Sequence, residues 1–185
     1  MRALFLILLC AAIQNLNAQL YNQEYFGEDG SQFLLGSIKK NRLTEGHYGQ
    51  WFNPQFSAYQ VDQEALALIE KSIEDYDLLL FLGTWCADSQ REVPGIFKIL
   101  EEAGYPTDLV EIYAVDERTE FRKTTPGGEA KARNIVRVPT LIFIKDGKEV
   151  NRIIELPVQT LEKDMIAIMN RQDYRPYYAD EQLPD

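Results

Sequence analysis

The chain has 185 residues with 19 basic and 29 acidic side chains, which give a formal net charge of −10 at pH 7. A 45% hydrophobic and 26% charged composition is typical of a globular protein and excludes a disordered chain. The negative charge argues against a nucleic-acid partner. One histidine and two cysteines cannot supply the ligands of a Cys/His zinc site, and there is neither a P-loop nor a Gly-x-Gly-x-x-Gly pattern. We therefore expect no bound metal and no cofactor.

The N-terminus has the layout of a secretory signal peptide. Residues 1–2 form a short positive start, an apolar run follows over 3–13, and Ala18 offers a small residue for cleavage. The apolar run is too short to span a bilayer, so we expect no membrane span. The sequence predicts a signal peptide at 1–18 and an exported protein, either periplasmic or secreted.

Signal cleavage has a consequence for the two cysteines. Cys10 leaves with the signal peptide, because bulky Leu9 before it disfavours the alternative of a lipoprotein anchored through Cys10. Cys86 is then the only thiol of the mature chain, so we expect no internal disulfide. Because each mature chain then has one unpaired thiol, two chains can also form a dimer through a Cys86–Cys86 disulfide.

Residues 19–60 are dense in aromatic side chains, which a flexible linker would lack. We interpret them as an ordered N-terminal extension that packs on the main domain. Within it, Leu34, Leu35 and Ile38 share one side of a helix predicted over 31–43. The pair Asn53-Pro54 predicts a break in the chain. The only histidine, His47, is interpreted as a surface or packing residue.

The rest of the chain alternates between helical and extended patterns. The predicted elements are a helix at 62–76 capped by Asp62, a buried strand at 78–83, a helix at 89–103 interrupted by Pro94, a strand at 109–115, a loop at 117–128, a short helix at 129–134, two strands at 140–145 and 148–154, and a helix at 157–170. Asp146-Gly147 suits a tight hairpin between the last two strands. This order predicts a mixed sheet with helices on both faces. The residues that follow form either a tail or a surface strap.

The segment 81–94, FLGTWCADSQREVP, carries the most information about function. Cys86 stands where a buried strand gives way to a helix. The thiolate is the reactive form of cysteine, and the free amides and dipole of a helix N-terminus stabilise it. Pro94 falls inside the helix, where a proline introduces a kink.

Two segments resemble the thioredoxin superfamily. Trp85-Cys86 followed by Ser89 and Pro94 resembles the active-site pattern Trp-Cys-x-x-Cys with its kink proline. Residues 135–148, IVRVPTLIFIKDGK, resemble the cis-proline strand and hairpin of the same superfamily. The resemblance implies an α/β, thioredoxin-like three-layer fold, with a central mixed β-sheet flanked by helices. The corresponding domain is predicted at 61–170, between the extension 19–60 and a C-terminal tail at 171–185, as in exported bacterial thioredoxin-like proteins.

The resemblance also implies roles for individual residues. Cys86 is the expected nucleophile, and Trp85 flanks it. Pro139 is expected in the cis form, facing the thiol. Val138 and Thr140 are expected to offer backbone groups to an extended substrate peptide, in the manner of an added strand.

The sequence departs from the superfamily at two positions. Ser89 replaces the resolving cysteine, so its hydroxyl either supports the thiolate of Cys86 by a hydrogen bond or caps the helix. Leu80 stands where thioredoxins keep a buried acid, and Asp88 is the candidate replacement unless it is only a solvated first-turn acid. A carboxylate beside the thiol disfavours the thiolate, and Arg91 can offset it. Asp88 and Arg91 are therefore candidate modulators of the thiol.

These observations predict a thiol–disulfide exchange protein with a single nucleophilic cysteine, related in activity to monothiol disulfide oxidoreductases and isomerases. It forms mixed disulfides with cysteine-containing proteins or with a small thiol or disulfide such as glutathione, and an outside thiol releases it. The alternative is a non-catalytic binding module that uses the cis-proline groove while Cys86 is buried and inert. A thiol peroxidase is a third reading, which requires a nearby arginine and a resolving thiol from elsewhere.

Overall fold

The computed structural model describes residues 21–27 and 29–183, so the predicted signal peptide and Cys10 lie outside the described residues. The elements are β1 (Gln23–Phe26), β2 (Gln32–Ile38), α2 (Lys40–Thr44), α3 (Gly46–Ala58), α4 (Gln63–Ile69), η1 (Ile73–Asp75), β3 (Asp77–Leu82), α5 (Ala87–Glu102), η2 (Thr107–Leu109), β4 (Glu111–Ala114), η3 (Thr119–Phe121), α6 (Glu129–Ala132), β5 (Thr140–Lys145), β6 (Lys148–Ile154) and α7 (Leu161–Met169), where η marks a 3-10 helix. None of the helices in these two ranges is long and apolar enough to cross a membrane.

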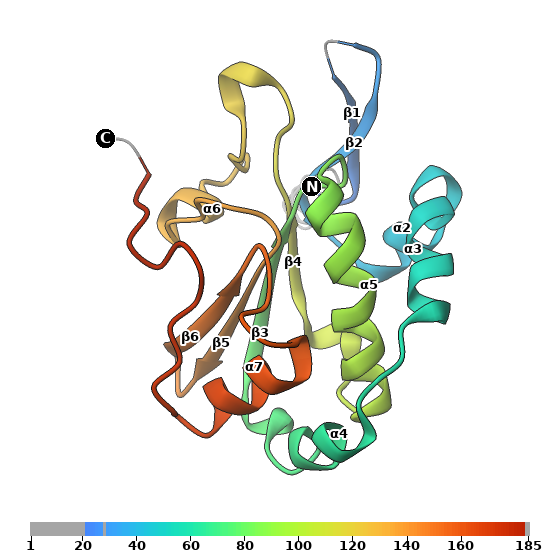
Figure 1. Ribbon diagram of the computed structural model, residues 1–185. Helices are drawn as coiled ribbons and strands as arrows, with labels where there is room; N and C mark the ends of the chain where they lie inside the picture. The colour runs from blue at the N-terminus through green and yellow to red at the C-terminus, as the bar shows by residue number, and fades with distance from the viewer. Residues whose placement is uncertain (1–20, 28, 184–185) are drawn as a thin grey trace, which may run out of the picture.

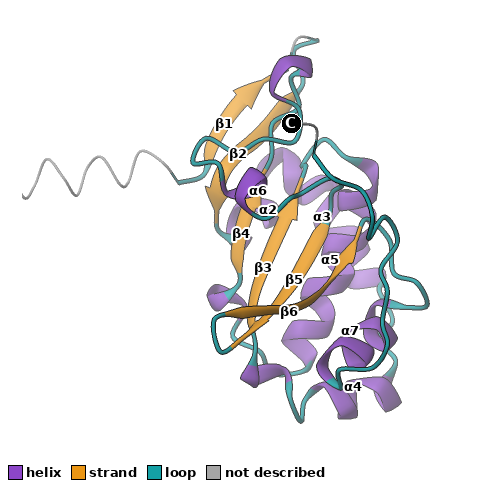
Figure 2. Cartoon of the chain, turned by 90° about the vertical axis from the view of Figure 1, so that its left-hand side faces the viewer, coloured by secondary structure: helices purple, strands orange, loops and turns teal. Residues whose placement is uncertain are grey.

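One sheet runs through the molecule in the order β1-β2-β4-β3-β5-β6 (Figure 2). Strands β3 and β4 are parallel, and α5 provides the crossover that a parallel pair needs. All other neighbouring strands are antiparallel. The mixed sheet predicted from the sequence is confirmed.

The side chains of β3 alternate between two hydrophobic cores, one on each face of the sheet. Leu78, Leu80 and Leu82 enter the larger core, which α3, α4, α5 and α7 cover (Figure 1). Leu79 and Phe81 point to the opposite face, where the smaller core includes residues of α6 and of the loop before β5. Helices therefore cover both faces as predicted, but most of the helical mass lies on one side.

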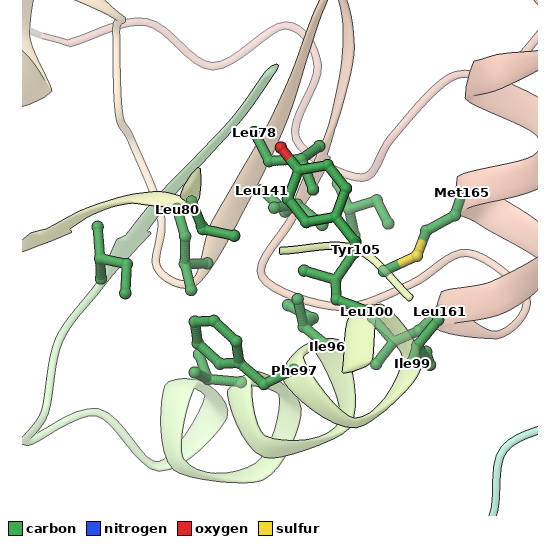
Figure 3. Packing of buried hydrophobic residues seen from close by; sticks show 14 of the residues in the cluster. Leu78, Leu80, Ile96, Phe97, Ile99, Leu100, Tyr105, Leu141, Leu161 and Met165 are labelled. Carbon is green, nitrogen blue, oxygen red and sulfur yellow. The ribbon is translucent and has the colours of Figure 1, made fainter. Parts of the chain in front are cut away.

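The larger core fixes the long helix α5 against the sheet. Figure 3 shows side chains of β3 and β5 facing those of α5 and α7. Leu80 and Phe97 are fully buried there, and burying such a side chain contributes about 1.5–3 kcal/mol. Because Cys86 directly precedes α5, this packing also fixes the position of the thiol.

The helix predicted over 31–43 is wrong for most of its length. Residues 32–38 form β2, which pairs with β1 on one side and with β4 on the other. Phe33, Leu34 and Leu35 are all buried, because a strand inside a sheet is covered on both faces. A continuous apolar run of this kind fits a buried strand as well as a helix. The extension thus contributes two strands to the main sheet.

The break predicted at Asn53-Pro54 is also wrong, because Pro54 lies inside α3. A proline in a helix costs about 3 kcal/mol or more. Burial compensates for it, since Phe52 is almost fully buried and its ring centre lies 6.1 Å from that of Phe97. The aromatic residues of the extension therefore pack against α5, which confirms that this segment is ordered.

Other local predictions are confirmed with shifted ends. Asp62 caps α4 by accepting the N–H groups of Glu64 and Ala65 at 3.0 and 3.2 Å. That helix ends at Ile69, and a separate 3-10 turn replaces the rest of the predicted helix because the chain must reverse to enter β3. The strands β5 and β6 have the predicted bounds.

The C-terminal residues form a surface strap, the second of the two predicted alternatives. The Tyr174 hydroxyl donates to the buried carboxylate of Asp164 at 2.8 Å, and the Asn151 side chain donates to the Tyr174 carbonyl at 2.9 Å. Further along, Glu181 accepts two hydrogen bonds from the Arg137 guanidinium, each at 3.0 Å. We call residues 172–183 the strap; it runs past β6 to the loop before β5 (Figure 1). The domain boundaries predicted from the sequence, with the extension at 19–60, the main domain at 61–170 and the tail at 171–185, stay predictions.

Candidate thiol site

Cys86 occupies the N-cap position of α5, at the end of a tight turn that follows β3. The Cys86 N–H donates to the Gly83 carbonyl at 2.9 Å, and the Cys86 carbonyl accepts the N–H of Gln90 at 2.9 Å. Glycine suits position 83, because a Cβ there would lie 2.8 Å from the Trp85 ring and the indole would have to move. The side chain of Cys86 is half-buried and faces the N-terminal end of a helix, where an anion is favoured.

The loop before β5 faces the thiol. The Val138–Pro139 peptide bond is cis, and the Cys86 Sγ lies 3.4 Å from the Val138 carbonyl oxygen. The Thr140 hydroxyl donates to the Arg137 carbonyl at 2.7 Å, which closes the loop from the strand side. The two segments that resemble the thioredoxin superfamily therefore meet at the sulfur atom.

Val138 and Thr140 differ in what they can offer to a partner. Thr140 is buried between Phe81 of β3 and Ile154 of β6, so its backbone lies inside the sheet. Val138 precedes β5 and directs its carbonyl at Cys86. The substrate-binding roles assigned to Trp85, Val138, Pro139 and Thr140 stay predictions.

Ser89 is fully buried, and its Oγ accepts the Gly83 N–H at 3.1 Å. The prediction that Ser89 caps the helix is wrong, because Cys86 holds the N-cap position and Ser89 lies within the first turn of α5. The hydroxyl instead ties the first turn of the helix to the turn before it. Its contact is thus with the backbone that positions the thiol.

Asp88 and Arg91 form an ion pair at 2.7 Å on the first turns of α5. Arg91 also contacts Glu92 at 2.7 Å, and hydrogen bonds to Glu92 and Asp88 raise the pKa of Arg91. Asp88 is therefore paired with Arg91, and the roles of both residues as modulators of the thiol stay predictions. Both side chains are partly exposed, so the pair contributes little to stability.

The N-terminal extension supports this site from the side of β2. The Leu34 N–H donates to the Thr84 hydroxyl at 3.1 Å, and the bond is buried. The Thr84 carbonyl accepts from the Gln90 side chain at 2.8 Å. Strand β2 thus fixes the residue before Trp85. His47 lies exposed on α3 and belongs to no part of the site.

The loop after β4 is a second support, and its structure was not foreseen. The Asp116 N–H donates to the Thr124 carbonyl at 3.0 Å, and the Lys123 N–H donates to the Asp116 carbonyl at 2.9 Å. The buried Asp116 carboxylate accepts from the Arg118 backbone N–H at 2.9 Å and from its guanidinium at 2.5 Å. The segment predicted as a plain loop is therefore closed on itself.

This closed loop brings two basic residues to the segments on either side of Cys86 in space, those of Trp85 and Val136, and sequence reasoning missed both. The guanidinium carbon of Arg122 lies 4.2 Å from the centre of the Trp85 ring. The Lys123 ammonium donates to the Val136 carbonyl at 2.9 Å, in the segment that leads to the cis-proline. The available signal was the basic cluster in residues 118–123 of an otherwise acidic chain.

The described residues hold no group of three or more His, Cys, Asp or Glu side chains arranged to bind a metal ion. The site places a partly exposed thiol at a helix N-terminus, directly after Trp85 and 3.4 Å from the carbonyl oxygen of the residue before the cis-proline. The thiolate form of a cysteine is the reactive one, and a helix N-terminus favours it.

Comparison with known proteins gives structural matches only. No protein-family profile matches the chain, and no curated protein sequence does. A protein of unknown function from Pseudomonas aeruginosa matches over 66% of this chain and 81% of its own, with 12% identity and a TM-score of 0.46. Thioredoxin O2 from Arabidopsis thaliana, in the oxidised state, matches over 56% of this chain and 84% of its own, with 24% identity and a TM-score of 0.38. A mutant thioredoxin from Halobacterium salinarum matches over 63% and 90%, with 20% identity and a TM-score of 0.34.

The fold assignment follows from the chain itself. A parallel β3–α5–β4 unit is joined to the antiparallel strands β5 and β6, with α7 packed on the same sheet. Cys86 begins the crossover helix, and the cis peptide bond before Pro139 lies opposite it. The described part of the chain has a thioredoxin-like fold.

Proposed function

We propose that this protein carries out thiol–disulfide exchange through Cys86. The observation that supports it is the placement of the sulfur. The thiol is half-buried at the N-cap of a long helix, and its Sγ lies 3.4 Å from the Val138 carbonyl beside the cis peptide bond. An inert structural cysteine is normally buried in apolar surroundings, without such an electropositive helix end.

The exchange proceeds in two balanced steps. The Cys86 thiolate attacks one sulfur of a partner disulfide, which forms a mixed disulfide and releases the other partner sulfur as a thiolate that takes up a proton. The side chain at position 89 is a serine, so the second attack cannot come from within the motif. The thiolate of another molecule, either a small thiol or a protein thiol, attacks the partner sulfur of the mixed disulfide. A new disulfide forms between the two, and Cys86 leaves as a thiolate. The partner sulfur released in the first step stays reduced, and the outside thiol is oxidised to the new disulfide.

We place this activity outside the cytoplasm, on the basis of the predicted signal peptide at 1–18. In an oxidising compartment a lone thiol forms disulfides with the partners that it meets. The proposed partners are cysteine-containing proteins or a small disulfide. A Cys86-linked dimer is one product that oxidation of the purified protein is expected to give.

The reactivity of Cys86 tests the proposal directly. A full-length chain carrying Cys10→Ser has Cys86 as its only thiol. We expect its exchange with the neutral disulfide dithiodipyridine at neutral pH to be about tenfold faster when folded than in a denaturant. The same chain with Cys86→Ser is the control and should release no chromophore.

The alternative function predicts a different result. A non-catalytic binding module has a thiol that reacts more slowly in the folded chain than in the unfolded one, because the fold shields it. Slow labelling of the folded chain would therefore overturn the exchange proposal. The cis-proline groove with Val138 would then be the feature to examine by peptide binding.

A further inference from the structure

Two basic side chains contact segments that adjoin Cys86. Arg122 stacks on Trp85, the residue directly before Cys86, with 4.2 Å between the guanidinium carbon and the ring centre. Lys123 is bonded to the Val136 carbonyl at 2.9 Å, in the segment that leads to the cis-proline loop. Each contact places a cation beside a segment that adjoins the sulfur, and the charge of the Cys86 thiolate acts on Lys123.

Neither cation forms an ion pair within residues 21–27 and 29–183. Three nearby groups are paired elsewhere: Asp88 with Arg91 at 2.7 Å, Asp116 with Arg118 at 2.5 Å, and Arg137 with Glu155 at 3.6 Å and with Glu181 at 3.0 Å. Asp29 and Glu117 line one surface pocket together with Arg122, so negative charge also lies near that guanidinium. Glu117 and Glu120 lie in the same loop, but neither forms an ion pair with Arg122 or Lys123. Among the described residues, both cations therefore lack a carboxylate within ion-pair distance.

In the free protein, the surroundings of Lys123 disfavour the charged form of its side chain. Burial is the main factor that lowers the pKa of Lys123, and the charges of Arg137 and Arg122 lower it further. The negative charge of Glu155 and of the Cys86 thiolate acts in the opposite direction. An arriving anion would compensate the same ammonium group. The closed loop between Asp116 and Thr124 holds the Lys123 backbone in place before any anion binds.

We propose that Arg122 and Lys123 select disulfides whose reacting sulfur is flanked by carboxylates. The inference rests on the proposed exchange at Cys86 and names the class of partner for it. The carboxylate pairs with the two cations while the neighbouring sulfur is attacked by the Cys86 thiolate. The bonds that form and break are those of the exchange already described, so no further reactant is needed. Arg122 and Lys123 are specificity-determining residues and take no part in proton transfer.

The test compares two small disulfides that differ in charge. Dithiobis(nitrobenzoate) carries a carboxylate on each half, and dithiodipyridine carries none. Second-order rates with Cys86 are measured for both reagents, in the full-length chain with Cys10→Ser, at low salt and at high salt. The intrinsic reactivity of the thiol contributes to both rates, so it cancels when one rate is divided by the other. A matched pair of disulfide-linked peptides, with glutamates or with lysines next to the cysteine, extends the comparison to protein partners.

Three variants are compared with that parent chain. Arg122→Gln removes the charge of an exposed side chain whose stacking partner is the partly buried Trp85, so the fold is expected to survive. Arg122→Gln with Lys123→Gln removes both charges. Lys71→Gln with Lys163→Gln is the control, since it makes the same change in net charge at two exposed positions remote from the thiol.

We expect the double variant to lower the anionic-to-neutral rate ratio about tenfold at low salt, the single variant to lower it in part, and the control to leave it nearly unchanged. High salt should reduce the preference of the parent chain, because these charges lie near the surface. A ratio that is the same in the parent and the double variant would overturn the inference while leaving the exchange function intact. Failure of both reagents to react with the parent would instead overturn the proposed function, and the inference with it.

Discussion

Replacement of Ser89 by alanine should destabilise the turn that presents Cys86 while leaving the reactivity of the thiol nearly intact. Ser89 is 0% exposed, and its Oγ accepts the Gly83 N–H at 3.1 Å. Ser89→Ala leaves that buried amide without its acceptor, which costs about 1–3 kcal/mol. Each kcal/mol lowers Tm by about 2–4 °C in a chain of this size, so we expect a decrease of about 2–12 °C.

Thermal unfolding by circular dichroism measures the first effect, and the exchange rate with dithiodipyridine measures the second. Ser57→Ala is the matched control, because Ser57 is exposed on α3. We expect the exchange rate of Ser89→Ala to stay within about twofold of the parent. An unchanged Tm would refute the assigned hydrogen bond. A rate about tenfold lower in a fully folded variant would show that the hydroxyl acts on the thiolate, contrary to the structure.

Three further predictions concern the same region. Gly83→Ala places a Cβ 2.8 Å from the Trp85 ring, so the indole must move. We expect the free energy of unfolding to fall by about 1–3 kcal/mol, and an unchanged Tm would contradict this packing. Ser89→Cys, made in the chain with Cys10→Ser, should convert the site to a dithiol. With excess dithiodipyridine it should release two thione equivalents per chain and end as an internal disulfide. The chain with Cys10→Ser alone should release one equivalent and end as a mixed disulfide. The hydrogen bond from Arg137 lowers the pKa of Glu181. The contribution of this contact to docking of the strap is therefore complete above the ordinary glutamate pKa of about 4.3, and it is lost as the pH falls through the lower folded value. Protection of the amides around Glu181 from hydrogen exchange should be lower at pH 3 than at pH 6, and Glu181→Gln should remove this pH dependence.

The central part of the fold was predictable because its signals are local. The apolar run that became β3, the cap at Asp62 and the turn at Asp146-Gly147 are each read within a few residues. The extension was harder to predict. The spacing of Leu34, Leu35 and Ile38 fits a helix and a doubly buried strand equally well, and only pairing with β4 decides between them.

Some features of the thiol site were likewise predictable from local sequence, and others were not. Cys86 and the loop of Val138 and Pro139 were identified from two motifs, and the structure brings them to 3.4 Å of each other. The role of Ser89 was not predictable, because the choice among its partners depends on where the Gly83 amide points. Nor did the motifs indicate that Arg122 reaches Trp85, since that contact depends on how the intervening loop closes.

The sequence by itself determined the strand–turn–helix that holds Cys86, the hairpin of β5 and β6, and the expectation of exchange without a second thiol in the motif. These follow from apolar periodicity, turn residues and the chemistry of single side chains, which are properties of short segments. Only the tertiary structure decided that Thr84 is fixed by β2, that Arg122 and Lys123 contact Trp85 and Val136, and that Glu181 of the strap pairs with Arg137. These contacts join residues far apart in the chain. Their energy depends on distance and burial in the folded state, which no local pattern records.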